Sequence, residues 1–177
     1  MKSDLKFFKK KKCLPIDGFF KNVLYDKKFG YYTSKQPFGK EGDFITSPKI
    51  SNIFSEIIAV WLINTWENFG RPKKFNCVEL GPGDGCLTKT LLETFKKFPE
   101  FNSVKKMYLY EQSSFLIKTQ KINISDKNVK WIKNFNSITN GPVIFFGNEF
   151  FDAIPIKQFK KMNGSFFEKN YTINKNF

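Results

Sequence analysis

The glycine-rich stretch at residues 75–92, FNCVELGPGDGCLTKTLL, constrains the fold of this chain more than any other. It starts with an apolar run typical of a strand, passes through three alternating glycines, and continues with apolar residues at helical spacing. Gly81, Gly83 and Gly85 carry no Cβ, so the backbone can turn sharply there and approach a ligand closely. The stretch therefore predicts a strand, a tight loop and a helix whose N-terminus points at a binding site.

Strand and helix patterns alternate after this loop. Helical spacing predicts helices at 86–98 and 113–122, and apolar runs predict strands at 106–110, 129–132 and 142–146. Strands separated by helices predict an α/β fold of Rossmann-like type, with a parallel sheet covered by helices.

The two ends of the chain carry other patterns. Residues 15–25 and 51–69 have helical periodicity, and a loop rich in Gly, Pro and aromatic residues is expected between them at 29–44. Residues 156–173 are expected to form one or two strands with a turn at Asn163-Gly164. The longer helix is expected to turn one apolar stripe inward, made by Ile53, Phe54, Ile57, Ile58, Trp61 and Leu62.

Composition excludes several kinds of site. The chain has no histidine, which excludes Ser-His-Asp triads, Cys-His nucleophiles and histidine metal sites within it. Its three cysteines form no CxxC pair, and reduced thiols fit a reducing compartment. No apolar run approaches the roughly 20 residues that span a bilayer. We therefore expect an intracellular protein without a membrane span, cytoplasmic if bacterial and in the mitochondrial matrix if eukaryotic.

The net charge of +14 raises nucleic acid as a partner. Arg71, however, is the only arginine among the 30 basic residues, and arginine is the usual bidentate reader of guanine and phosphate. The lysines are also spread along the chain, apart from the run at 9–12. Nucleic acid is therefore not the favoured partner, and residues 1–12 are expected to form a basic, flexible tail.

The glycine loop differs from the familiar phosphate-binding loops. A dinucleotide fingerprint reads G-x-G-x-x-G and a Walker loop ends in G-K-[ST], whereas this loop reads G-x-G-x-G after the carboxylate of Glu79. An anion beside the loop disfavours a pyrophosphate and favours a ligand with a cationic part, such as the amino group and sulfonium of S-adenosylmethionine. Taken alone, the loop also fits a plain strand-to-helix turn.

Two more groups follow strands of the same predicted sheet. Glu111 ends the second strand, where a carboxylate can accept both ribose hydroxyls of a nucleoside. Asn148, Glu149 and Asp152 of NEFFDAIP follow the fourth strand, and their oxygens can orient a nucleophilic nitrogen or hold a guanidinium. The alternative is that Glu111 is an ordinary acid at a helix N-terminus and that NEFFDAIP only forms a turn.

Five segments together resemble the MidA-type class I methyltransferases, which include the mitochondrial arginine methyltransferase that assists respiratory complex I assembly. They are LYDKKFGYY, PFGKEGDFITSPKISNIFSEIIAVW, VELGPGDGCL, YLYEQS and NEFFDAIPIKQF, in family order and within residues 14–160. Their combination is far more specific than a glycine loop. The resemblance implies a Rossmann-like domain that uses S-adenosyl-L-methionine, with a protein arginine nitrogen as the methyl acceptor.

The resemblance also implies site residues outside the sheet. The segment GDFITSP would fold over the cofactor, with Asp43 meeting the cofactor's amino group. The predicted catalytic residues are Asn148, Glu149 and Asp152. The predicted cofactor-binding residues are Gly42, Asp43, Phe44, Thr46, Glu79, Gly81, Gly83, Glu111, Trp131 and Asn148.

The chain is expected to consist of three segments. They are a basic flexible tail at 1–12, a helical and loop cap over the cofactor site at 13–72, and a Rossmann-like cofactor-binding core at 73–177. Family members continue much further, so we expect an incomplete sheet with an unpaired edge. Lys49 also departs from the family, which usually has an acid in the segment SPKIS.

A protein substrate is the expected partner, with a respiratory complex subunit and a homodimer as finer expectations. Two other functions stay open. One is a nucleic-acid methyltransferase, although NEFF is not the N/D-P-P-Y/F motif of enzymes that methylate exocyclic base nitrogens. The other is an assembly factor that binds the cofactor without catalysis.

Overall fold

The computed structural model describes residues 13–34, 47–138 and 140–172, and it divides the chain into two compact units. The first unit combines 1–37 with 151–177, and the second is 38–150. These bounds differ from the domain boundaries expected after residues 12 and 72, which stay a prediction. No helix of the described residues is long and apolar enough to cross a membrane.

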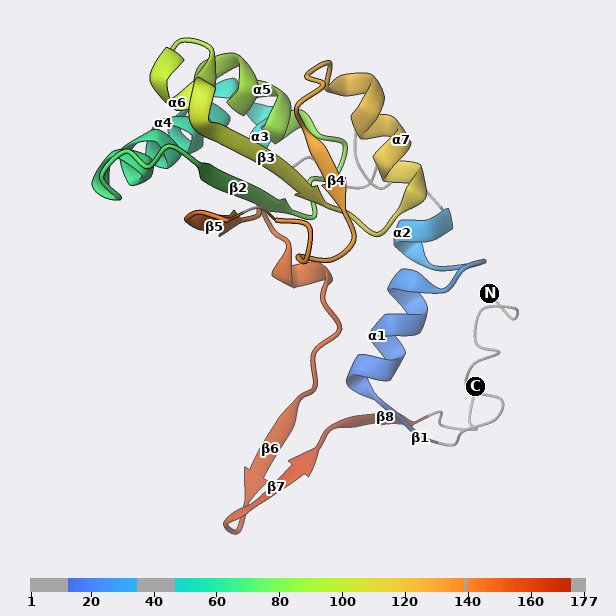
Figure 1. Ribbon diagram of the computed structural model, residues 1–177. Coiled ribbons are helices and arrows are strands. Elements are labelled where there is room, and N and C mark those ends of the chain that lie inside the picture. The colour runs from blue at the N-terminus through green and yellow to red at the C-terminus, as the bar shows by residue number, and fades with distance from the viewer. Residues whose placement is uncertain (1–12, 35–46, 139, 173–177) are drawn as a thin grey trace. The chain divides into compact units, whose positions relative to one another are not determined.

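The second unit is built on a four-stranded parallel sheet in the order β4-β3-β2-β5 (Figure 1). Cys77 in the central strand lies opposite Met107 on one side and Ile144 on the other. The predicted parallel sheet is therefore confirmed. Its strands are β2 (Phe75–Leu80), β3 (Lys105–Tyr110), β4 (Lys130–Ile132) and β5 (Val143–Phe146).

The strand order places a binding region at the end of β2. The chain adds β3 and β4 on one side of β2 and then crosses to add β5 on the other side. Strand order therefore reverses between β2 and β5, and parallel α/β sheets bind ligands at such a point, beyond the carboxyl ends of the strands. The glycine loop leaves β2 at this point.

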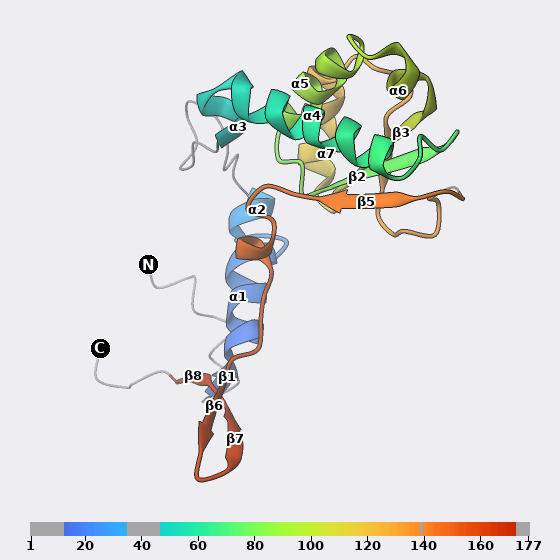
Figure 2. The same cartoon turned by 90° about the vertical axis from the view of Figure 1, so that its left-hand side faces the viewer.

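The helices of the second unit lie on one face of its sheet (Figures 1 and 2). They are α4 (Asn52–Asn68), α5 (Cys86–Phe95), α6 (Pro99–Val104) and α7 (Ser114–Asn123), and a short helix, α3 (Ser47–Ile50), precedes them. The helix expected at 86–98 ends earlier, at Phe95, because Pro99 starts α6 instead of only ending α5. Proline favours the first turn of a helix, where its missing N–H costs nothing.

The apolar core of this unit lies between the helices and the sheet. Its largest members are aromatic and include Trp66: Phe75, Phe95 and Phe101 are almost fully buried, and Phe101 contacts both other phenylalanine rings at centroid distances of 4.9–6.0 Å. Edge-to-face packing of this kind adds to the burial of apolar area. The opposite face of the sheet holds a smaller cluster around Val78, Tyr108 and Ile132.

The predicted apolar stripe of α4 is wrong for half of its members. Leu62 is buried, but Ile53, Ile57 and Trp61 are 63%, 61% and 47% exposed. The side that packs inward instead includes the small residues Ser55 and Ala59, both fully buried. Small side chains let two helices approach closely, and α4 packs against α5, which the pattern of large apolar residues did not indicate.

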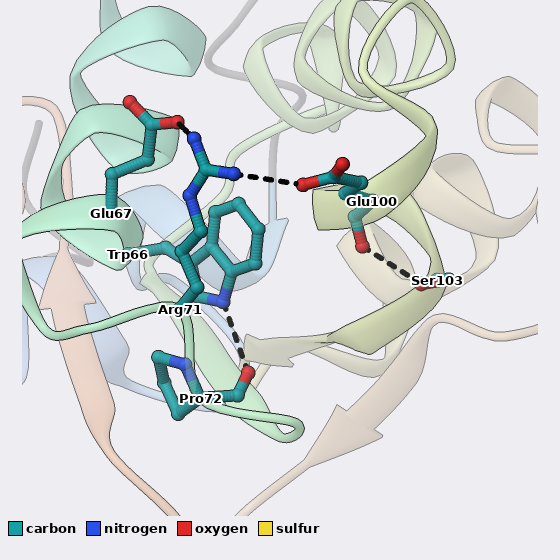
Figure 3. Close-up of polar contacts among 6 residues, drawn as sticks. All are labelled: Trp66, Glu67, Arg71, Pro72, Glu100 and Ser103. Carbon is teal, nitrogen blue, oxygen red and sulfur yellow. Dashed lines mark hydrogen bonds and ion pairs between the residues drawn. The ribbon is translucent and has the colours of Figure 1, made fainter.

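The end of α4 forms the stop that the sequence predicts at Gly70-Arg71-Pro72. Gly70 is left-handed, with φ of 79°, and its N–H donates to the Glu67 carbonyl while the Arg71 N–H donates to Trp66. This is the Schellman pattern that satisfies the last carbonyls of a helix. The Trp66 indole N–H in turn donates to the Pro72 carbonyl at 3.0 Å (Figure 3).

The only arginine of the chain is engaged at this helix end. Arg71 forms ion pairs with Glu67 of α4 at 2.5 Å and with Glu100 of α6 at 3.1 Å (Figure 3). Its guanidinium also lies over the Trp66 ring, 5.6 Å from the centroid. Arg71 therefore joins two helices instead of standing free for a phosphate or a base.

The first unit joins the two ends of the chain. The predicted N-terminal helix is α1 (Ile16–Tyr25), and the expected irregular loop after it contains a short helix, α2 (Tyr31–Ser34). The predicted turn at Asn163-Gly164 joins the hairpin strands β6 (Phe159–Met162) and β7 (Ser165–Glu168).

The antiparallel pair of β1 (Cys13–Pro15) and β8 (Asn170–Thr172) was not expected. A 3-10 turn, η2, covers Phe151–Ala153.

Candidate functional site

The glycine loop has the sharp backbone turn that its sequence predicts. Gly81, Gly83 and Gly85 all have positive φ, at 60°, 57° and 84°. The Gly81 N–H donates to the Tyr110 carbonyl of the neighbouring strand at 3.1 Å, so the loop is fixed to the ends of both β2 and β3. Side chains rarely tolerate this conformation, which explains why glycine stands at each turn.

Two of these glycines also leave no room for a Cβ. An added Cβ at Gly81 would lie 2.6 Å from Cδ2 of Phe150, and one at Gly85 would lie 2.9 Å from Cδ1 of Ile124. The Phe150 ring therefore rests on the loop, and it also meets Tyr110 edge to face at 6.4 Å. Phe150 belongs to NEFFDAIP, so one residue of the segment expected to face the acceptor packs directly on the predicted cofactor loop.

Glu79 lies beneath the loop and not on its surface. Only 2% of the residue is exposed, and Oε2 accepts a hydrogen bond from the Thr88 hydroxyl of α5. Burial raises the pKa of Glu79 to about 7, against the smaller opposing effect of the Thr88 hydrogen bond. Glu79 therefore ties the end of β2 to the first turns of α5, and a direct contact with a ligand stays a prediction.

Glu111 stands at the end of β3, as predicted, and is 9% exposed. Its Oε1 accepts from the Ser113 N–H at 2.7 Å, and Gln120 Nε2 lies 3.4 Å from Oε2. Burial raises the pKa of the carboxyl, while hydrogen bonds from the Ser113 and Gln112 backbones and from Gln120 lower it.

Gln120 of α7 brings three of the predicted cofactor-binding residues together. Its Nε2 donates to the Gly83 carbonyl at 2.7 Å and faces Glu111, and its Oε1 accepts from the Trp131 indole at 2.9 Å. Sequence reasoning missed this residue, because a glutamine within a helical pattern carries no signal of its distant partners.

A second set of contacts missed from the sequence holds Asp84 of the loop. Asn123 Nδ2 donates to the Asp84 carbonyl at 2.9 Å, and Asp84 Oδ1 accepts from the Cys86 N–H at 3.2 Å. Lys49 of α3 forms an ion pair with Asp84 Oδ2 at 2.6 Å, with both side chains about four-fifths buried. The lysine that departs from the family pattern therefore has a partner in this chain, the acid of the glycine loop.

The predicted catalytic residues are brought together only in part. Asn148 Nδ2 donates to Glu149 Oε1 over a long 3.4 Å, and Glu149 is left-handed, with φ of 55°. This conformation is uncommon for a residue with a side chain, and it often marks a functional turn. Asp152 lies in η2 of the first unit, and the structure does not fix the two units relative to one another, so the three residues are not joined into one site.

Four predicted cofactor-binding residues, Gly42, Asp43, Phe44 and Thr46, lie outside the described residues. Glu79, Gly81, Gly83, Glu111 and Trp131 gather around the carboxyl ends of β2 and β3.

The donors and acceptors at these strand ends fit a nucleoside. The Glu111 carboxylate accepts from the Ser113 N–H and from Gln120, and a carboxylate has about four acceptor sites, so it keeps acceptor capacity for hydroxyl groups. The left-handed glycines let the backbone approach a ligand without a Cβ between them.

Known proteins resemble this chain in both sequence and structure. Residues 57–176 match a family described as S-adenosyl-L-methionine-dependent methyltransferases. The chain is 32% identical over 177 residues to the Drosophila melanogaster mitochondrial protein arginine methyltransferase NDUFAF7 homolog, covering 88% of this chain and 40% of that protein. It is 30% identical over 172 residues to the human mitochondrial protein arginine methyltransferase NDUFAF7, covering 84% and 39%.

A COG1565 superfamily protein from Burkholderia thailandensis, solved with S-adenosyl-homocysteine bound, has the same fold as this chain, with a TM-score of 0.75. The two sequences are 23% identical, and the match covers 93% of this chain and 43% of the Burkholderia chain. The chain spans about 40% of the length of the curated relatives it matches. Since the family match extends over more than half of its residues, the chain belongs to this family of S-adenosyl-L-methionine-dependent methyltransferases.

Proposed function

We propose that the protein to which this chain belongs binds S-adenosyl-L-methionine at the carboxyl ends of β2 and β3 and methylates a protein arginine nitrogen. The observation that carries the proposal is a nearly buried carboxylate, Glu111, beside a left-handed glycine loop at the point where strand order reverses. The relatives named as protein arginine methyltransferases support the acceptor class.

Within this site, Glu111 accepts the ribose hydroxyls, and Gly81 and Gly83 let the loop backbone lie against the ligand. Trp131 and Asn148 complete the described part of the cofactor site, and the further residues proposed to bind the cofactor, Gly42, Asp43, Phe44 and Thr46, lie outside the described residues. Glu79, with a pKa of about 7, is charged in part at neutral pH, and a nearby cationic group would favour its charged form. When bound, the cofactor supplies an electrophilic methyl group on a sulfonium.

The segment after β5 receives the acceptor. Glu149 holds the guanidinium through charge-assisted hydrogen bonds, Asn148 orients it, and Asp152 is the third group proposed for this role. The Phe150 ring, which rests on Gly81, excludes water between the loop and the acceptor. Phe151, which the sequence also suggested as a wall, is 75% exposed. The acceptor proton passes to Glu149, to Asp152 or to a group outside these 177 residues, which contain no histidine.

The finer assignments carry over from the family resemblance of the sequence motifs. We propose a protein of MidA type whose substrate is a subunit of a respiratory complex and which works as a homodimer, in the cytoplasm of a bacterium or in the mitochondrial matrix of a eukaryote. A nucleic-acid substrate is less favoured, because Arg71 is held by Glu67, Glu100 and Trp66. Binding to RNA or DNA that falls steeply with added salt would support that alternative.

Calorimetry with S-adenosyl-homocysteine tests the cofactor site. Glu111→Ala should weaken binding at least about tenfold, because each hydroxyl bonded to a carboxylate contributes roughly 1.5–3 kcal/mol. The matched control is Glu93→Ala, which removes an exposed acid from α5 and should bind as the parent does. A ligand that lacks both ribose hydroxyls should bind the parent and Glu111→Ala alike. Equal loss in both variants, or no binding by the parent, contradicts the site.

The acceptor assignment needs a protein as long as the curated relatives. In that protein, Glu149→Gln keeps the shape of the side chain and removes its charge, so arginine methylation should fall at least about tenfold, or roughly 1.4 kcal/mol of barrier. Cofactor affinity should change little. Cofactor binding without methyl transfer to any protein or RNA by the parent would support the assembly-factor alternative instead.

A further inference from the structure

We infer that Gln120 of α7 is a positioning residue of this site: its side-chain amide holds the Gly83 carbonyl, the Glu111 carboxylate and the Trp131 indole in one arrangement to which the nucleoside binds. The inference rests on the proposed function and extends it to a residue that touches no reacting atom.

The geometry joins four separate parts of the fold through a single side chain. Gln120 is fully buried, and its amide reaches the loop after β2, the end of β3 and strand β4 at 2.7, 3.4 and 2.9 Å. These parts of the chain carry Gly83, Glu111 and Trp131, three of the predicted cofactor-binding residues. A movement of α7 would therefore shift the loop carbonyl, the carboxylate and the indole together.

The chemistry of the three partners requires an amide. Gly83 and Glu111 present acceptors and the Trp131 indole presents a donor, so the residue between them must supply two donors and one acceptor. A charged glutamate would set an acceptor against both the carbonyl and the carboxylate, and methionine supplies no donor. A reversed amide would also place oxygen against oxygen at Gly83.

A purely structural role for Gln120 would predict a different outcome of its loss. A buried amide that only fills the core would, when replaced, lower the stability of the fold and leave the properties of any bound ligand site unchanged. Replacing a positioning residue also changes the pKa of Glu111. The side-chain N–H of Gln120 donates one of the three hydrogen bonds that favour the charged form of this carboxylate.

This difference appears in the pH dependence of binding. Burial raises the pKa of Glu111. Hydrogen bonds from the Gln120 side chain and from the Ser113 and Gln112 backbone N–H groups lower it. Among the described residues, no charged side chain contributes to this shift. A carboxylate that accepts two hydroxyls must be charged, so affinity falls as pH falls through the pKa of Glu111. Without the Gln120 amide that pKa is higher, and the fall in affinity occurs at a higher pH.

The experiment measures S-adenosyl-homocysteine affinity of the full chain by calorimetry between about pH 5 and pH 8, for the parent and three variants. Gln120→Met should bind at least about tenfold more weakly at neutral pH and should lose affinity at a higher pH than the parent. Asn123→Leu removes the other bond from α7 to the loop, so it should weaken binding with the pH profile unmoved. Lys118→Met, an exposed change on the same helix, should match the parent.

Nuclear magnetic resonance of the unsubstituted chain, the parent, provides a second test that does not depend on the folding of Gln120→Met. The side-chain amide of Gln120 and the Trp131 indole N–H should both shift in nitrogen-proton spectra when S-adenosyl-homocysteine binds. The Trp66 indole, bonded to Pro72, should not shift. Parent binding with no shift at Gln120, or Gln120→Met with the parent's affinity and pH profile, overturns the inference and leaves the proposed function standing. No binding by the parent overturns both.

Discussion

At the scale of single residues, the carboxylates at the strand ends are held in unusual states. Glu79 is 2% exposed and accepts a hydrogen bond from Thr88, while Glu111 is 9% exposed and is contacted by Gln120. Desolvation disfavours the charged form of both groups. Burying a charged carboxylate lowers the stability of a fold. Carboxylates with pKa values shifted in this way therefore cluster at functional sites, where they bind ligands or take part in catalysis.

Glu79→Gln should stabilise the fold above neutral pH. The folded-state pKa of about 7 exceeds the usual 4.5, so the stability linked to this group is complete below about pH 4.5 and is lost as pH rises through about 7. The loss corresponds to about 3 kcal/mol. Glutamine stays neutral and can still accept from Thr88, so urea unfolding at about pH 8 should show a gain of that order. Glu93→Gln, which changes an exposed acid on α5, is the control, and an unchanged pH profile in Glu79→Gln would contradict the assignment.

At the scale of elements, the ends of the helices are set by local hydrogen bonds. Ser51 accepts from the Ile53 N–H at the start of α4, Ser113 accepts from Leu116 at the start of α7, and the Schellman pattern ends α4. These bonds satisfy backbone groups that a helix cannot pair internally. They explain why the two helix starts expected near Ser51 and Ser113 are correct.

Gly70→Ala should destabilise the chain by about 1 kcal/mol, since an L-residue is strained at φ of 79° and the Schellman bonds depend on that conformation. The cost should be strain alone, because nothing lies within 4 Å of the added Cβ. Chemical denaturation measures the loss. Asn68→Ala, an exposed change within the last turn of α4, should stay within about 0.5 kcal/mol of the parent. A Gly70→Ala variant as stable as Asn68→Ala would show that the turn adapts without strain.

At the scale of the whole molecule, the second unit has an apolar edge. In the described residues β5 pairs with β2 alone, and the outward residues Val143 and Phe145 are 39% and 48% exposed. Phe135, 45% exposed, meets Phe145 edge to face at 5.3 Å. An apolar edge strand is a template for association with another chain.

Phe145→Lys should therefore reduce self-association of the chain. A lysine on the exposed side of β5 adds charge next to the free edge without removing a backbone hydrogen bond. Sedimentation and light scattering should show a smaller associated fraction than for the parent. Ile122→Lys is the matched control, since it changes an 81% exposed apolar residue on α7, away from the edge. An equal effect of both variants would indicate that net charge alone governs association.

The parallel sheet, the helices that follow its strands and the glycine loop could all be predicted from the sequence. These features depend on short-range patterns: apolar runs, helical spacing and glycines where φ is positive. The family resemblance came from motifs of the same local kind. Elements without a local pattern, such as the pairing of Cys13 with Thr172, were missed because their partners lie at opposite ends of the chain.

The side chains that hold the site together could be identified only from their contacts in the folded chain. Gln120 meets Gly83 across 37 positions of sequence, and Lys49 meets Asp84 only because α3 packs beside the loop. The inward side of α4 likewise includes the small residues Ser55 and Ala59, which the pattern of large apolar residues did not indicate. Such contacts depend on the path of the whole backbone and on the space between elements, and neither is encoded in the spacing of residues along one segment.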